Sequence, residues 1–143
     1  MAAPADPLIE KLRTLYRETD ALFAGWSCAA SGGCCRFSVT GRQPFLWPIE
    51  WRLLRAALRA NPPPKGTAPG DCPLFDPNAR RCRDYAARPF GCRTHFCSQA
   101  SAAGKNPRGS IRDLARRLAD LAAADQPGGT LRPLLSWQAS ARR

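Results

Sequence analysis

Long apolar runs are missing from this sequence of 143 residues. No window contains the roughly eighteen consecutive apolar residues that a membrane-spanning helix requires, which excludes an integral membrane protein. The first twelve residues also lack the basic stretch followed by an apolar core that marks a secretory signal. We therefore expect a cytoplasmic protein.

Large apolar side chains are also few. Alanine accounts for 24 and cysteine for 7 of the apolar residues, which leaves 32 larger ones, and the β-branched aliphatic residues are Val39, Ile9, Ile49 and Ile111. This composition does not favour a large β-sheet. The chain also contains 14 prolines and 11 glycines, and ordering such irregular backbone costs about 1 to 2 kcal/mol per residue. We therefore expect an interaction other than apolar burial to stabilise the fold.

Two segments of the N-terminal half have the apolar periodicity of amphipathic helices. The first spans residues 7–23 and starts after Asp6, whose side chain can accept hydrogen bonds from the amides of the first turn. The second spans residues 48–61 and ends before Pro62, because the three consecutive prolines there cannot continue a helix.

A third helix is predicted over residues 110–126. Ser110 and Asp113 have the spacing of a capping box at its start, and apolar residues follow at helical intervals. The tail from Thr130 is predicted to pack back on the rest of the chain. Residues 110–126 form the helical C-terminal part of a single domain that spans residues 1–143.

Between the helices lies a cysteine-rich core, residues 28–97, in which periodicity fades. Phe37–Thr40 is predicted to be a short strand, and Cys72–Tyr85 is predicted to be a hairpin that turns at Pro77–Asn78. The predicted fold class is therefore mainly α, with three helices around a loop-rich metal-binding core and at most a small β-hairpin.

The seven cysteines fall into two groups outside the helical stripes: Cys28, Cys34 and Cys35, then Cys72, Cys82, Cys92 and Cys97. In a reducing compartment disulfides are disfavoured, and an odd number of thiols cannot pair completely. Buried cysteines that only fill space would be scattered over helix faces. The grouping therefore predicts metal ligands.

The spacing leaves the metal open between zinc and an iron–sulfur cluster. The short CxxC knuckles of zinc ribbons are missing, and iron–sulfur clusters tolerate wider and adjacent spacings. His95, the only histidine, lies between Cys92 and Cys97 and is an eighth candidate ligand. Eight donors can fill two tetrahedral sites, or one site with spare thiols. Because adjacent side chains in extended backbone diverge, either Cys34 or Cys35 faces a second metal or none.

Arginines surround the second cysteine group and make the chain basic, with a formal net charge of +11. They can stabilise thiolates, bind phosphate or form a solvated face, and the sequence does not separate these uses. The residues concerned are Arg80, Arg81, Arg83, Arg88 and Arg93.

The order of the cysteine motifs is distinctive. It runs from Cys28 and the pair Cys34-Cys35, through a helix around Glu50, to Cys72-Pro73-Leu74-Phe75, Cys82-x-x-Tyr85 and Arg88-Pro89-x-x-Cys92-Arg93. Over residues 23–97 this order resembles the YkgJ-like family of bacterial cysteine-cluster proteins. The resemblance implies a small zinc- or iron-chelating domain with zinc or an iron–sulfur cluster as cofactor.

The chain departs from that family in its first motif. Family members carry a further cysteine between the positions of Cys28 and Cys34, whereas residues 29–33 read AASGG here. The resemblance then implies that His95 or a solvent molecule completes the coordination.

Three functions follow from these observations. The first is a metal-binding protein whose iron–sulfur cluster or zinc has a redox or electron-transfer role. The second is a basic nucleic-acid-binding module with structural zinc, although Trp26, Trp47, Trp51 and Phe90 are not interleaved with basic residues as in a base-stacking platform. The third is a component of a metal-dependent oxidoreductase or methyl-transfer system, since a similar cysteine cluster accompanies flagellin lysine methylase. The sequence names no substrate or protein partner.

Overall fold

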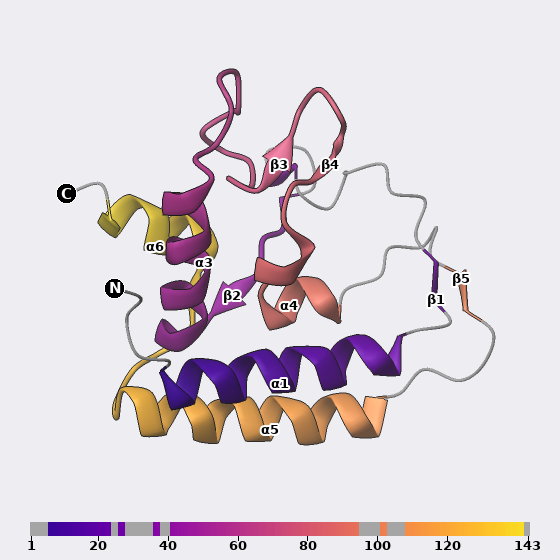
Figure 1. Cartoon of the computed structure of the whole chain (residues 1–143), viewed down its shortest axis with the longest axis vertical. Coiled ribbons are helices and arrows are strands. Elements are labelled where there is room, and N and C mark those ends of the chain that lie inside the picture. Colours follow the sequence, from indigo (N-terminus) through magenta and orange to yellow (C-terminus); the bar gives the residue numbers. More distant parts are fainter. Residues whose placement is uncertain are drawn as a thin grey trace.

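Helices make up most of the structure, a computed structural model that describes residues 6–23, 26–27, 36–37, 41–94, 101–102 and 108–141 (Figure 1). Their bounds are α1 (Pro7–Leu22), α3 (Pro48–Ala60), α4 (Phe90–Arg93), α5 (Arg108–Asp125) and α6 (Leu134–Ala141), with a 3-10 turn, η2 (Tyr85–Ala87). Short antiparallel pairs join β1 (Trp26–Ser27) to β5 (Ser101–Ala102), β2 (Phe45–Leu46) to β6 (Arg132–Pro133), and β3 (Phe75–Asp76) to β4 (Arg81–Cys82). The mainly α fold predicted from the sequence is confirmed.

The first two helices begin and end as their local signals predict. Asp6 caps α1, because its Oδ1 accepts from the backbone N–H groups of Leu8 (3.0 Å) and Ile9 (3.4 Å). At the start of α3 the Glu50 side chain accepts from the Trp47 N–H group at 3.2 Å. α3 ends at Ala60, ahead of the three prolines.

The third helix starts earlier than predicted. α5 begins at Arg108, so Ser110 lies inside the first turn and the predicted capping box is wrong. The tail packs back as expected: Leu134 is fully buried, and Trp137 stacks on Trp51 with ring centroids 6.4 Å apart. None of the described helices is long and apolar enough to cross a membrane.

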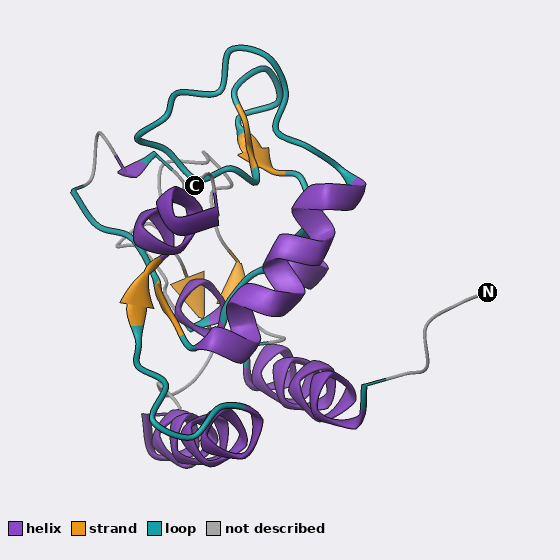
Figure 2. Cartoon of the chain, turned by 90° about the vertical axis from the view of Figure 1, so that its left-hand side faces the viewer, coloured by secondary structure: helices purple, strands orange, loops and turns teal. Residues whose placement is uncertain are grey.

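Two apolar clusters hold the helices together. α1 and α5 lie side by side and run in opposite directions (Figure 1), and with α3 they bury the first cluster: Leu12, Leu15, Tyr16, Ile49, Leu53, Leu114, Leu118 and Ala122. The second cluster joins α3, α6 and the β3–β4 hairpin: Phe37, Leu46, Trp51, Leu54, Cys72, Leu74, Phe75, Cys82, Ala87 and Leu134. The loop from α3 to the hairpin lies at the end of the fold opposite α1 and α5 (Figures 1 and 2).

The predicted hairpin is present, with β3 and β4 joined by a turn over residues 77–80. Asp76 fixes this turn, since its Oδ1 accepts from the N–H groups of Asn78 (2.8 Å) and Ala79 (3.2 Å). The prediction of a strand at Phe37–Thr40 is wrong at Phe37. This residue lies in a helical turn, and its carbonyl accepts from the Gly41 N–H group at 2.8 Å. Residues 38–40 lie outside the described part of the chain.

Candidate metal centre

The β3–β4 hairpin carries two of the predicted ligands, and both are buried. Cys72 precedes β3 in a tight turn, in which the Phe75 N–H group donates to the Cys72 carbonyl at 3.0 Å and Pro73 occupies the second position. Cys82 lies on β4 directly opposite Phe75. The exposed fractions of Cys72 and Cys82 are 4% and 7%, and both belong to the second apolar cluster.

A third predicted ligand, Cys92, is half-buried on the single turn of α4. Its N–H group donates to the carbonyl of Pro89, the residue directly before α4, at 3.0 Å. The N–H group of Phe90, the first residue of α4, donates to Glu50 Oε2 at 2.8 Å. The position of Cys92 is therefore tied to a carboxylate on α3.

Glu50 accepts hydrogen bonds from three different segments, a role that its place in the motif order did not predict. Its exposed fraction is 1%, and besides Phe90 and Trp47 it accepts from the Tyr16 hydroxyl at 2.8 Å. Burial raises the pKa of the Glu50 carboxyl above its ordinary value of 4.5, although its hydrogen bonds oppose that shift. Burial and the neighbouring Glu50 charge raise the pKa of Tyr16 well above 10, and the Cys92 thiol is close enough to add to this effect.

Arg93 connects the same network to α1. Its exposed fraction is 4%, its Nη1 donates to Asp20 at 2.5 Å, and its guanidinium lies 4.1 Å from the centre of the Tyr16 ring. It also donates to the carbonyls of three residues in the preceding loop, Tyr85 (3.2 Å), Ala86 (2.7 Å) and Arg88 (2.8 Å). Arg93 therefore links α1 to the segment before α4 and does not belong to a solvated basic face.

Glu50 and Arg93 had signals in the sequence that were too general to reveal these roles. Glu50 occupies the third position of a helix, where a glutamate usually serves the exposed cap. Arg93 immediately follows Cys92 in the RPFGCR run, where it resembles its neighbouring arginines. Their partners lie up to 73 residues away, in elements that only the fold brings together.

The remaining predicted ligands, Cys28, Cys34, Cys35, Cys97 and His95, lie outside the described residues. Within the described ranges, no three histidine, cysteine or acidic side chains form a group that could hold a metal ion. Cys72, Cys82 and Cys92 therefore do not make a site by themselves. The ligand set stays a prediction.

Residues on both flanks of the first cysteine group have partners that are distant in the sequence. Phe37, two residues after Cys35, is 5% exposed and belongs to the apolar cluster that contains Cys72 and Cys82. At the other flank Ser27, which directly precedes Cys28, pairs with Ser101 in the β1–β5 ladder. Ser101 follows Cys97 by four residues.

A mainly helical chain with buried thiols beside irregular loops defines a small cysteine-rich domain. The model of the CxxCxxCC family, described as "Putative zinc- or iron-chelating domain", matches residues 27–109, more than half of the chain. The chain belongs to this family, which supports binding of zinc or iron. No curated protein and no solved structure matches the chain.

The family's name also identifies where this chain departs from it. With Cys28 as the first position, the pattern CxxCxxCC continues through residues 31, 34 and 35. Cys34 and Cys35 fit, whereas Ser31 stands where the pattern has its second cysteine. The chain therefore has seven thiols as candidate ligands.

Proposed function

We propose that thiolates from the two cysteine groups bind one shared iron–sulfur cluster, which orders the irregular middle of the chain and carries electrons. The observation that carries this proposal is the burial of Phe37 in the apolar cluster of Cys72 and Cys82. Cys35 precedes Phe37 by two residues, and two residues span at most about 7 Å of backbone, so the chain can bring the first cysteine group to this cluster.

The β1–β5 pairing supports the same convergence at the other flank. Paired residues across an antiparallel ladder have Cα atoms about 4.5 to 5.5 Å apart, and the register joins Ser27 to Ser101. Cys28 is bonded to the first of these residues, and Cys97 is tethered to the second through three intervening residues. The pairing therefore supports a short connection from Cys28 to Cys97 through the β1–β5 ladder, and the burial of Phe37 supports a connection from Cys35 to Cys72 and Cys82.

The donor set favours an iron–sulfur cluster over a single zinc ion. Zinc in structural sites takes four ligands, usually from two short knuckles, and this chain has seven thiols and no CxxC pair. Iron–sulfur clusters bind cysteine thiolates at irregular spacings. Such a centre also supplies the stabilisation that the composition lacks, because metal binding is coupled to folding when the unfolded chain has no preformed site.

Anaerobic purification of the full chain tests this proposal. We expect a coloured protein with stoichiometric iron and acid-labile sulfide, whose visible absorption bleaches on reduction and returns on oxidation. A colourless protein that carries zinc would overturn the iron–sulfur assignment. A coloured protein whose absorption does not respond to reductant would overturn the electron-transfer role alone.

A further inference from the structure

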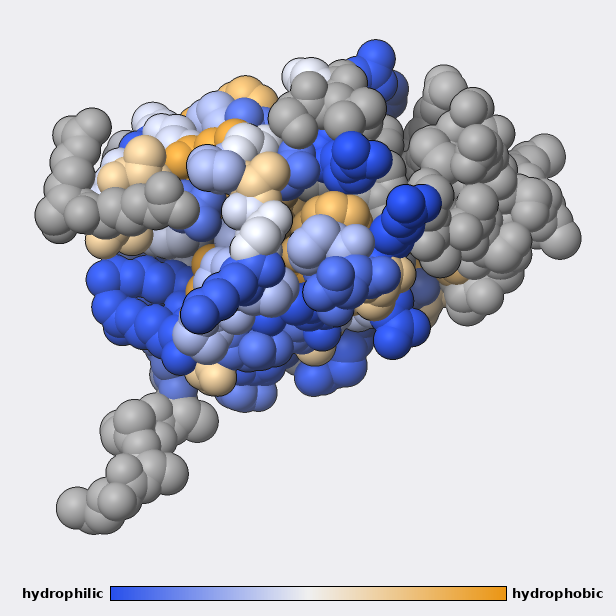
Figure 3. All heavy atoms as spheres, turned by 90° about the horizontal axis from the view of Figure 1, so that it is seen from above, coloured by the Kyte–Doolittle hydropathy of each residue, from blue (hydrophilic) through white to orange (hydrophobic). Residues whose placement is uncertain are grey.

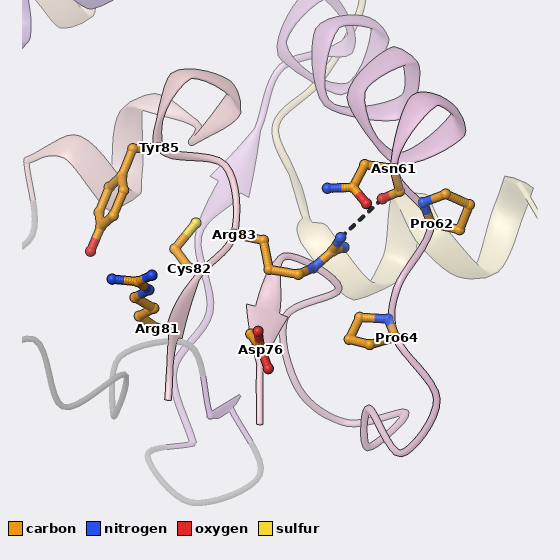
Figure 4. A pocket seen from close by; sticks show the side chains of 8 residues that line it. All are labelled: Asn61, Pro62, Pro64, Asp76, Arg81, Cys82, Arg83 and Tyr85. Carbon is orange, nitrogen blue, oxygen red and sulfur yellow. Dashed lines mark hydrogen bonds between the residues drawn. The ribbon is translucent and has the colours of Figure 1, made fainter. Parts of the chain in front are cut away.

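A polar hollow of about 570 Å³ lies between the C-terminal end of α3 and the β3–β4 hairpin (Figure 4). Two prolines of the loop after α3 line it, together with Asn61, Asp76, Arg81, Cys82, Arg83 and Tyr85. Its volume falls within the range of about 300 to 1,000 Å³ that small-molecule sites have. Seen from this end, the surface mixes hydrophilic residues with apolar ones (Figure 3).

Two arginines of the hollow lie on either side of the candidate metal ligand Cys82 in the sequence. Arg81 is exposed and Cys82 is buried on β4, and the Arg83 N–H group donates to the Leu74 carbonyl at 2.7 Å, which continues the ladder. Arg81 and Arg83 flank Cys82 in the sequence, and all three residues line the hollow, with Arg83 pointing toward Asn61 and Arg81 lying near Tyr85 (Figure 4).

The charges in the hollow are unbalanced. In the described part of the chain, no carboxylate lies within ion-pair distance of Arg81 or Arg83. Asp76 faces Arg81 across the ladder, and its Oδ1 is already used by the turn amides. The two arginines and one aspartate leave a net charge of +1 in the lining.

Arg83 is held in place without a counter-ion. Its two terminal nitrogens donate to the carbonyls of Asn61 (3.2 Å) and Pro73 (2.7 Å), and the first of these bonds is drawn in Figure 4. Its Nε is buried without a hydrogen-bond partner, so the guanidinium keeps unused donor capacity. Because the Arg83 side chain is already fixed, less conformational entropy is lost when a ligand binds.

Tyr85 adds a neutral donor to this basic lining. Its side chain is 51% exposed, and the Arg88 guanidinium lies 4.4 Å from the centre of its ring. The ring is therefore in contact with a cation outside the hollow, and its hydroxyl lies on the same side of the hollow as Arg81 (Figure 4). A hydroxyl group and guanidinium groups together suit an oxygen-rich anion.

We propose that this hollow binds a small solute that carries a carboxylate or phosphate group, with Arg81 as its main contact and Arg83 as a fixed positive charge. The site goes beyond the proposed function, because its arginines bind a soluble anion and not the metal, although the candidate ligand Cys82 also lines the hollow. Binding is expected whether the metal centre contains iron or zinc.

Calorimetric titration of the full metal-loaded chain with inorganic phosphate and, separately, with succinate tests the proposal and distinguishes the two anion classes. We expect saturable binding of at least one probe, weakened roughly tenfold by Arg81→Gln, which removes a charge-assisted hydrogen bond. Arg80→Gln is the matched control, because Arg80 is exposed in the hairpin turn directly before Arg81 and does not line the hollow.

Asp76→Asn provides a change of opposite sign. The asparagine oxygen can still accept from the turn amides, while the lining loses its negative charge, so we expect tighter anion binding. Equal weakening by Arg80→Gln and Arg81→Gln would show that only the overall charge attracts the anion and would overturn the proposal. No tightening by Asp76→Asn would overturn it as well, because it would mean that the anion does not sense the charge of the lining. Loss of bound metal in Arg81→Gln would do the same by assigning Arg81 to the metal centre, without bearing on which metal is bound.

Discussion

The Tyr16 hydroxyl on α1 donates to Glu50 Oε2 on α3 at 2.8 Å, and both side chains are almost completely buried. The same oxygen accepts from the Phe90 N–H group at the start of α4. One carboxylate oxygen therefore connects the two long N-terminal helices to the turn that carries Cys92. This network fixes the position of the turn that carries the candidate metal ligand Cys92.

Replacing Glu50 with glutamine should change how stability depends on pH. Burial raises the pKa of Glu50 above 4.5, so the folded protein holds a proton at pH values where the unfolded chain has lost it. The resulting contribution to the free energy of unfolding is complete below pH 4.5 and is lost as the pH rises through the folded-state pKa. The stability of wild type relative to Glu50→Gln should therefore fall as the pH rises through this interval.

Urea unfolding of both proteins from about pH 4 to pH 8 measures this difference. Glu10→Gln, on the exposed side of α1, controls for the loss of one negative charge. A difference between wild type and Glu50→Gln that stays constant over the interval would contradict the prediction.

Tyr16→Phe should cost about 1 kcal/mol of unfolding free energy, because it removes one donor from a buried carboxylate and leaves the aromatic packing intact. Tyr85→Phe is the matched control: that ring is 51% exposed and should change stability by less than about 0.5 kcal/mol. Urea midpoints of the two variants provide the comparison. Equal effects would mean that the Tyr16–Glu50 bond adds nothing to stability.

Elements with local signals could be predicted from the sequence. Asp6 caps α1 within its own first turn, three prolines end α3, and Asp76 fixes the hairpin turn two residues away. The predicted start of α5 was wrong, because Ser110 and Asp113 match a capping pattern but lie inside the helix, which begins at Arg108. Local patterns therefore predicted which elements form better than where they begin.

The connections between elements could not be predicted in this way. Glu50 meets Tyr16 and Phe90 across 34 and 40 residues, and Arg93 meets Asp20 across 73. No periodicity encodes such pairs, because each side chain alone looks like an exposed charge on a helix or a loop. For the same reason cysteine spacing predicts a metal site without determining which thiols share one ion.

Arg93→Lys should destabilise the protein by about 2 to 4 kcal/mol despite keeping the charge. A single ammonium group cannot serve Asp20 and three loop carbonyls at once, as the guanidinium does. Arg88→Lys is the control, since Arg88 lies over the exposed ring of Tyr85 and a comparable contact contributes about 0.5 to 1 kcal/mol. Thermal unfolding that ranks Arg88→Lys as the more damaging change would refute this role of Arg93.

Cys82→Ser should abolish metal binding, whereas Leu74→Ala should only weaken the fold. Both residues belong to the second apolar cluster and are nearly buried, with exposed fractions of 7% and 2%. Truncating a buried leucine costs about 2 to 5 kcal/mol through the cavity that it leaves, but it removes no thiolate. Serine is close to cysteine in size but has no thiolate to bind the metal. Iron, zinc and sulfide per folded chain should therefore fall in Cys82→Ser and stay at the wild-type level in Leu74→Ala. If Cys82→Ser retains its metal, Cys82 is a buried core residue, and the centre must be built from the other thiols.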